Sequence, residues 1–356
     1  MTMWANTEHT WDVSVAVVDQ NSLENVRGQL RDLDLKQCSV TEGYDTDSRV
    51  QARIGTHVRE FEADGYVDKS RLRITLSVPE WGWSRELVTG YVTDSELTLS
   101  QGFVDRQYTT DSVMWALGKD LLPCNVVCAK GQTVMEVTRW WLNTARMPFI
   151  EYGPNDRRYG ETKSYEIGES ILSTLFDMND GLNRFDMDGH GRMVIHAKPD
   201  PRAASPIMTL DASDPRTLIC SELVRTSDEW DIVSRVIVTA SESSNGESHT
   251  IAGYADSNPD WPSAPQIRGY NIGKKEGYDG PSEHPNAQEL TNIARQKLWD
   301  EQPTSITWDF TVLFCDLHIG DIVTLVPFSY ERKCLITSVQ TDLGDMTQKI
   351  TAKEIW

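Results

Sequence analysis

The sequence contains no apolar run that approaches the ~20 residues needed by a membrane-spanning helix. Its first segment, Met1 to Val13, also lacks a basic region followed by an apolar stretch, which is the pattern of a secretory leader. No membrane segment is therefore expected. We expect the chain to be made in a cytoplasm.

Basic residues are scarce relative to acidic ones. The chain has 34 Lys and Arg against 54 Asp and Glu, which gives a net charge of −20. A surface of this charge repels phosphate backbones, so sequence-specific binding of nucleic acid is not expected. An acidic wall does suit a passage through which DNA moves without adhering.

Sequence motifs of catalysis are missing. There is no nucleophile elbow, no phosphate-binding loop and no dinucleotide-binding glycine pattern, and Gly189-His190-Gly191 does not stand between a strand and a helix. No spacing supplies the positioned acid or metal of a peptidoglycan hydrolase. The sequence therefore predicts no enzymatic activity and no catalytic or cofactor-binding residue.

Metal sites are also not expected. Asp186 and Asp188 lie beside His190, but the glutamate that an EF-hand loop requires is absent, and Asp188-Gly189 is typical of a hairpin turn. His190 and His196 have no partners at metal-binding spacing, and Cys124 and Cys128 have no second ligand pair nearby. The six cysteines stand in apolar surroundings, which favours buried free thiols: Cys38, Cys124, Cys128, Cys220, Cys315 and Cys334.

What the chain does contain is a long series of strand patterns. Over residues 1–125, short runs of alternating apolar and polar residues are separated by polar turns, and Arg71 to Val78 is one example. This pattern predicts a first tube-like β-barrel domain. Within it, Arg85 to Thr93 and Ser95 to Gln101 are expected to form separate strands, and Gln107 to Ala116 is expected to form the last one.

Over residues 126–209 the spacing of apolar residues changes from that of strands to that of helices, which predicts a small α/β insertion domain. Helices are expected from Gln132 to Arg146 and from Glu169 to Asn179, where apolar residues recur at helical spacing. A hairpin from Arg184 to Ala197 follows, with its turn at Asp188-Gly189.

Residues 210–356 predict a second β domain. A strand pair is expected near Ser234 to Ala255, followed by a long loop over 256–285 that is interpreted as a partner-contacting arm. A helix over 286–301, with Asn286 as its N-cap, is expected to dock onto a terminal barrel over 306–356. The fold class is thus mainly β, with two antiparallel barrels and a small α/β domain.

This layout resembles the tail-hub proteins of tailed phages. The group includes the baseplate hub of contractile phages, the N-terminal hub region of siphophage tail-associated proteins and the hub domain of the type VI secretion spike. The matching parts are the helix that ends in Ala294 to Leu298, the run His318-Ile319-Gly320-Asp321-Ile322-Val323 and the Leu343-Gly344 turn.

The resemblance implies a structural virion protein of the tail tip. Such hubs form homotrimers in which two barrels per chain adapt a six-fold tail tube to a three-fold tip. The implied partners are a tail tube or distal tail protein and tip or central fibre proteins. A tape-measure protein is a further partner that the resemblance allows. DNA is implied only as a molecule that passes through during genome ejection. Because no lysin module follows the terminal barrel, cell-wall cleavage is expected to belong to other proteins.

A second hypothesis is a host cell-wall binding module or a peptidoglycan-degrading tail enzyme. It rests on the tryptophans, since carbohydrate binding needs exposed aromatic rings. Trp140 and Trp141 are neighbours on one expected helix, so at least one of them is expected in the core. The residues considered for sugar contact are Trp81, Trp83, Trp140, Trp141 and Trp261.

Overall fold

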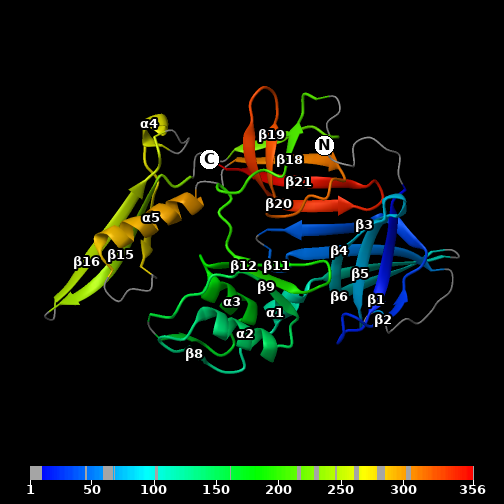
Figure 1. Cartoon of the computed structure of the whole chain (residues 1–356), viewed down its shortest axis with the longest axis horizontal. Helices are drawn as coiled ribbons and strands as arrows, with labels where there is room; N and C mark the ends of the chain where they lie inside the picture. Colours follow the sequence, from blue (N-terminus) through cyan, green and yellow to red (C-terminus); the bar gives the residue numbers. More distant parts are fainter. Residues whose placement is uncertain are drawn as a thin grey trace.

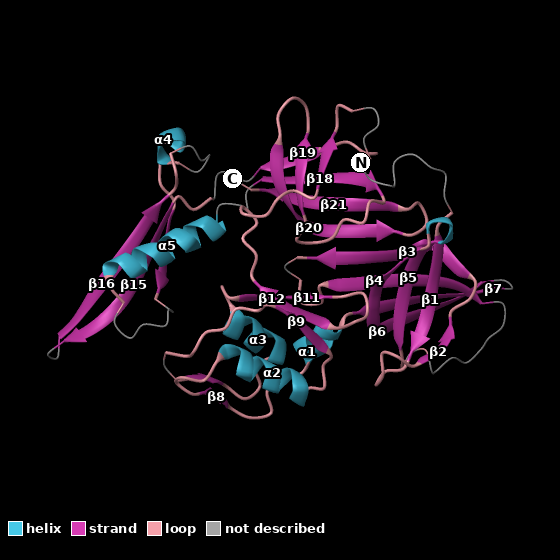
Figure 2. Cartoon of the chain, viewed as in Figure 1, coloured by secondary structure: helices cyan, strands magenta, loops and turns pink. Residues whose placement is uncertain are grey.

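The computed structural model describes residues 10–44, 46–58, 67, 69–100, 103–160, 162–214, 218–227, 232–244, 247–259, 264–278, 285–301 and 306–355. Strands dominate, and the α-helices belong to two places: a domain inserted below the main sheet and a smaller unit beside it (Figures 1 and 2). The prediction of a mainly β fold with an α/β insertion is confirmed. Among the described helices, none combines the length and apolar character needed to cross a bilayer.

One 13-stranded sheet joins the first and the last β regions of the chain (Figure 1). The order of its main path is β2-β1-β5-β6-β7-β4-β3-β20-β21-β18-β14, and β19 and β13 branch from β20. The bounds are β1 Asp12–Val18, β2 Val26–Gln29, β3 Leu33–Gly43, β4 Val50–Val58, β5 Arg71–Val78, β6 Trp83–Ser100, β7 Phe103–Asp111, β13 Met208–Asp211, β14 Val224–Ser227, β18 Ile306–Leu313, β19 Ile322–Val326, β20 Arg332–Asp342 and β21 Thr347–Glu354.

Alternation of apolar and polar residues explains why these segments become half-buried strands. In β18, Ile306, Trp308 and Phe310 are buried, while the residues between them are partly exposed. Because side chains on a strand point to opposite faces in turn, every second residue reaches the core. The expected strand at β5 has the bounds predicted for it.

β20 connects the two regions because its two halves pair with different strands. Its first half pairs with β19, where Leu335 lies opposite Ile322, and its second half pairs with β3, where Ser338 lies opposite Gly43. The sequence predicted two separate barrels. The described strands instead share one sheet, and their path stays open at β2 and β14 with no closed barrel.

Two details of the first β region differ from expectation. β6 is one long strand rather than two, with an irregular register at Val92 and Asp94 near the predicted break. Its first part pairs with β5 and its second part with β7. The predicted last strand ends at Asp111, because Val113 begins a short helix, α1 (Val113–Lys119), whose apolar residues pack into the insertion.

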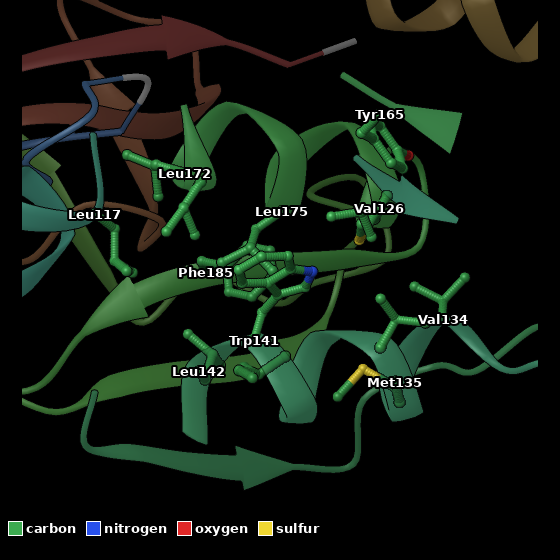
Figure 3. Close-up of a cluster of buried hydrophobic side chains, with 14 of the residues drawn as sticks. Leu117, Val126, Val134, Met135, Trp141, Leu142, Tyr165, Leu172, Leu175 and Phe185 are labelled. Carbon is green, nitrogen blue, oxygen red and sulfur yellow. The ribbon is translucent and has the colours of Figure 1, made fainter. Parts of the chain in front are cut away.

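The inserted domain has its own hydrophobic core, built mainly between α2 (Val134–Thr144), α3 (Ile171–Asn179) and the hairpin of β11 (Asn183–Met187) and β12 (Met193–Ala197). Trp141 and Phe185 both belong to this core, part of which is drawn in Figure 3. A capping box begins α2: Thr133 Oγ1 accepts from the Glu136 amide, and Glu136 accepts from the Thr133 amide. The remaining strands are β8 (Val126–Cys128), β9 (Phe149–Tyr152) and β10 (Lys163–Tyr165).

A separate small unit consists of β15 (Arg235–Ser244), β16 (Glu247–Asp256), β17 (Gly273–Gly277), α4 (Pro265–Arg268) and α5 (Ala287–Glu301). Leu290, Ala294 and Leu298 of α5 are buried against Val236 and Val238 of β15. The expectation that this helix docks onto the terminal strands is therefore wrong, because its apolar face is covered by the preceding hairpin. Part of the predicted loop over 256–285 forms α4 and β17; residues 260–263 and 279–284 lie outside the described residues.

Candidate functional site

The junction between β3 and β20 carries a buried cluster of ionisable groups. Glu42 of β3 lies opposite Val339 of β20 and reaches His318, which precedes β19. Glu42 Oε1 lies 2.7 Å from His318 Nδ1, and Asp316 Oδ1 lies 3.3 Å from His318 Nε2. The backbone N–H of His318 donates to Asp321 Oδ2 at 2.8 Å. The cluster thus links the first β region to the terminal one through side chains as well as through the sheet.

The carboxylates around His318 keep its imidazole charged. Burial alone lowers the pKa of His318, but the nearby charge of Glu42 and hydrogen bonds from His318 to Asp316 and Glu42 raise it to about 10. Burial also raises the pKa of Asp321 above its usual value. Glu42 and His318 are only 12% and 25% exposed, so water screens this pair weakly.

Arg85 of β6, another strand of the first β region, also joins the cluster. Its guanidinium forms an ion pair with Asp316, which adopts a left-handed backbone conformation with φ of 60°. Nearby, Phe314 packs edge-on against Trp11 and Trp83, with ring centroids 5.0 and 6.3 Å apart. Polar and aromatic contacts therefore both hold the segment after β18 against the first β region.

The turn of the β11–β12 hairpin fixes the insertion to β6. Thr89 Oγ1 donates to the carbonyl oxygen of Gly189 at 2.7 Å, and His190 Nδ1 lies 2.6 Å from Glu86 Oε2. A Cβ added at Gly189 would lie 1.8 Å from the carbonyl oxygen of Glu86, so a larger residue has no room. The glycine predicted from turn chemistry is also required by this close approach.

Two buried arginines form a second attachment of the insertion. Arg184 of β11 donates to the carbonyl oxygen of Tyr44 at 3.2 Å, and its guanidinium lies 3.3 Å from the centroid of the Tyr44 ring. Arg49 donates from Nε to the carbonyl oxygen of Phe185 at 3.1 Å. Both arginines are 8% exposed. Such planar stacking and directed hydrogen bonding are contacts that Lys does not reproduce.

The residues considered for metal binding have other partners. His196 Nε2 lies 2.7 Å from Asp186 Oδ2, and Asp186 also pairs with Arg184. Asp188 is paired with Arg192 and accepts from its backbone N–H across the turn. Over the described part of the chain, no group of three His, Cys, Asp or Glu side chains is arranged to hold a metal ion.

Cysteines Cys124 and Cys128 do not act as a pair. Cys128 is buried in the core of the insertion, and burial raises the pKa of its thiol, whereas Cys124 is exposed. Cys38, Cys315 and Cys334 are buried free thiols as predicted, but Cys220 is exposed. The exposure of Cys124 and Cys220 corrects the expectation for those two residues.

The tryptophans considered for sugar binding fall into separate clusters. Trp141 is 2% exposed in the core of the insertion, which confirms that one of the two neighbours is a core residue, while Trp140 is 55% exposed. Trp83 packs against Trp11 and Phe314 at the sheet junction. Trp261 lies outside the described residues.

The sequence did not predict the His318 cluster. Glu42 and His318 are 276 residues apart, and no local pattern connects them. An acidic residue near the end of a strand, such as Glu42, is a weak signal in so acidic a chain. Gln348, one of the polar residues buried in the terminal sheet, was equally hidden, because a single Gln in a strand carries no indication of its burial.

Comparisons with known proteins give a fold but no sequence family. No protein-family model matches the chain, and no curated protein sequence matches it significantly. Solved structures of tail proteins do match over almost its full length. A tail protein from Neisseria meningitidis MC58 has 14% identity and a TM-score of 0.69, with 96% of each chain covered.

Two further structures extend this comparison. The 43 kDa tail protein of prophage MuSo2 from Shewanella oneidensis has 12% identity and a TM-score of 0.66, covering 96% of this chain and 98% of that chain. The E. coli c3393 protein, a type VI secretion component similar in structure to T4 bacteriophage tail proteins, has 12% identity and a TM-score of 0.52, covering 98% and 76%. The chain therefore has the fold of phage tail proteins, a fold shared with a type VI secretion component. The resemblance seen in the sequence layout is confirmed at this level.

Proposed function

We propose that this protein is a structural component of a phage-type tail and acts as the hub of its tip or baseplate. The observation that carries the proposal is the match of the whole chain, from the first β region to the terminal one, to solved tail proteins of nearly the same length. A fold shared over the full chain favours a shared architectural role more than a match to one domain does, although fold alone does not determine function.

The working form in this proposal is a homotrimer that adapts a six-fold tail tube to a three-fold tip and lines the DNA channel. In this proposal, the two β regions of each chain, which β3 and β20 join into one sheet, each contribute one part of the ring, so that three chains present six. The net charge of −20 suits a wall that DNA passes without binding. The proposed partners are a tube or distal tail protein and tip or central fibre proteins, and the proposed role involves no catalysis.

Oligomer mass and shape test this proposal. The purified full chain is examined by light scattering after size exclusion and by negative-stain electron microscopy. We expect three copies in a ring with a central opening. A protein that stays monomeric at high concentration, and that antibodies do not detect in the virion, would contradict the hub assignment.

Among the candidate tryptophans that the structure describes, the exposed ring of Trp140 supports the cell-wall hypothesis. Sedimentation with purified peptidoglycan separates it from the hub proposal. Retention that is lost in Trp140→Ala would favour wall binding, and release of soluble muropeptides would identify an enzyme. We expect neither.

A further inference from the structure

A cleft of about 750 Å³ lies where the insertion, the terminal strands and α5 meet. Tyr44 and Arg184 line it from the attachment described above, Leu335 and Ile355 from the terminal strands, and Arg295 from α5. Its volume is in the range of sites that enclose a ligand or part of a peptide. None of the residues of the His318 cluster lines this cleft.

The charge of the cleft is opposite to that of the chain. Its acidic lining residues are Asp180 and Asp200. Its basic lining residues are more numerous: Arg49, Arg184, Lys198, Arg202, Arg295 and Lys353. Because acidic residues outnumber basic ones over the whole sequence, this concentration of positive charge makes the cleft the complement of an anionic ligand.

Three of these cations come from three different elements. Lys198 follows β12, Arg295 lies on α5 and Lys353 lies on β21. Within the described ranges none of the three forms an ion pair, and the hydrogen bond found for the Arg295 side chain goes to neutral Asn292. Because the basic side chains outnumber the acidic ones in the cleft and like charges repel one another, an anion placed between them is stabilised.

The base of the cleft is rigid and partly apolar. Arg49 and Arg184 are held by carbonyl oxygens and lie over the rings of Phe176 and Tyr44, respectively. Leu335 and Ile355 are buried beside Tyr44. A ligand for this site therefore needs negative groups at the rim and some apolar surface below them.

These features favour one class of occupant. Nucleic acid binds through long series of phosphate contacts over an extended basic surface, and outside this cleft the chain is strongly acidic. A peptide that alternates carboxylate and apolar side chains satisfies both parts of a cleft of this size. We propose that the cleft binds an extended acidic segment of a partner polypeptide.

Fluorescence anisotropy with a labelled peptide tests the proposal. The probe is a short peptide of alternating Glu and Leu, compared with the same peptide carrying Gln in place of Glu and with a labelled single-stranded oligonucleotide. The full chain is expected to bind the Glu peptide, to bind it more weakly at higher salt and to prefer it over both comparisons. The double variant K198E/K353E is expected to weaken binding at least about tenfold.

The chain offers a matched control. Lys36 and Lys349 are exposed and lie outside the cleft, and Lys349 is on the same strand as Lys353. K36E/K349E changes the net charge equally and is expected to leave the affinity unchanged. R295E, which lies on a different unit, repeats the test if the first double variant does not fold.

The proposal is overturned by any of three results. These are no binding of the Glu peptide, an equal loss of affinity in the cleft and control variants, and binding of the oligonucleotide as tight as that of the peptide. The last result would identify a general polyanion site.

Discussion

Glu42 Oε1 and His318 Nδ1 lie 2.7 Å apart although 276 residues separate them in the chain. Replacement of Glu42 by Gln removes the charge that holds His318 protonated and leaves a cation in a poorly hydrated place. We expect Glu42→Gln to lower the free energy of unfolding by about 2–3 kcal/mol, since breaking one side of a weakly solvated pair costs more than the pair contributes. Urea denaturation measures this change.

Glu331→Gln is the control for that variant, because Glu331 is exposed in the turn before β20. It is expected to change stability by less than about 0.5 kcal/mol. Equal effects of the two substitutions would show that the His318 cluster does not stabilise the junction.

The same pair predicts a dependence of stability on pH. His318 has a pKa raised to about 10 in the folded protein, compared with about 6.5 in an unfolded chain. The folded state therefore binds the proton more tightly, and the stabilisation is complete below about pH 6.5 and declines as the pH rises through the folded pKa. The stability difference between wild type and His318→Gln is expected to shrink between neutral pH and about pH 10.

Denaturation of both proteins across this range measures the difference directly. Subtraction of the variant removes the contributions of other groups, such as His57 and His196, whose pKa values are also raised by neighbouring aspartates. A difference that stays constant with pH would mean that His318 does not change its proton affinity on folding.

The close approach of Gly189 to β6 predicts a steric effect. Gly189→Ala places a methyl group against the backbone of Glu86, and either the turn or β6 must move. We expect a loss of about 1–3 kcal/mol and a lower Tm. Gly273→Ala is the control, because no atom lies within 4 Å of its added Cβ. A Tm that falls as much in the control as in Gly189→Ala would show that the hairpin turn is not tightly packed.

The side-chain amide of Gln348 is buried and fully hydrogen-bonded, so we expect its removal to destabilise the protein. Its Oε1 accepts from the backbone N–H groups of Cys315 and Leu317, and its Nε2 donates to the Leu317 carbonyl oxygen and to Thr341. Gln348→Leu leaves these groups without partners in the terminal sheet. We expect a loss of about 2–4 kcal/mol.

The matched substitution for that experiment is Gln340→Leu, because Gln340 is exposed on the neighbouring strand β20. It is expected to be close to neutral in chemical denaturation. A comparable loss at both positions would assign the effect to the change of side chain rather than to the buried hydrogen bonds.

The elements that the sequence predicted are those whose burial is decided locally. β5 and β18 alternate between core and solvent, and α2 presents one apolar face, so periodicity is enough to locate them. The turn at Asp188-Gly189 followed from its residue types. Each of these signals is contained within a few consecutive residues.

The parts that were missed depend on partners distant in the sequence. Nothing in β20 shows that its second half pairs with β3, because backbone groups pair with any strand that reaches them. The apolar face of α5 fits the hairpin as well as it would fit the terminal strands, so its docking site could not be read from its pattern. The His318 cluster and the basic cleft arise only after these contacts bring their residues together.

The pairing of β3 with β20 also affects how the molecule is made. From Ser39 to Gly43, one edge of β3 pairs with β20. The ribosome makes β20 only after it has made the insertion and the β15–β16 hairpin, so this edge of β3 stays unpaired until then. An open strand edge is a template for pairing with another chain, and long-range strand pairing is slow because the ends of a long loop must first meet. During synthesis, this edge of the first β region is therefore open to pairing with other chains until β20 has been made.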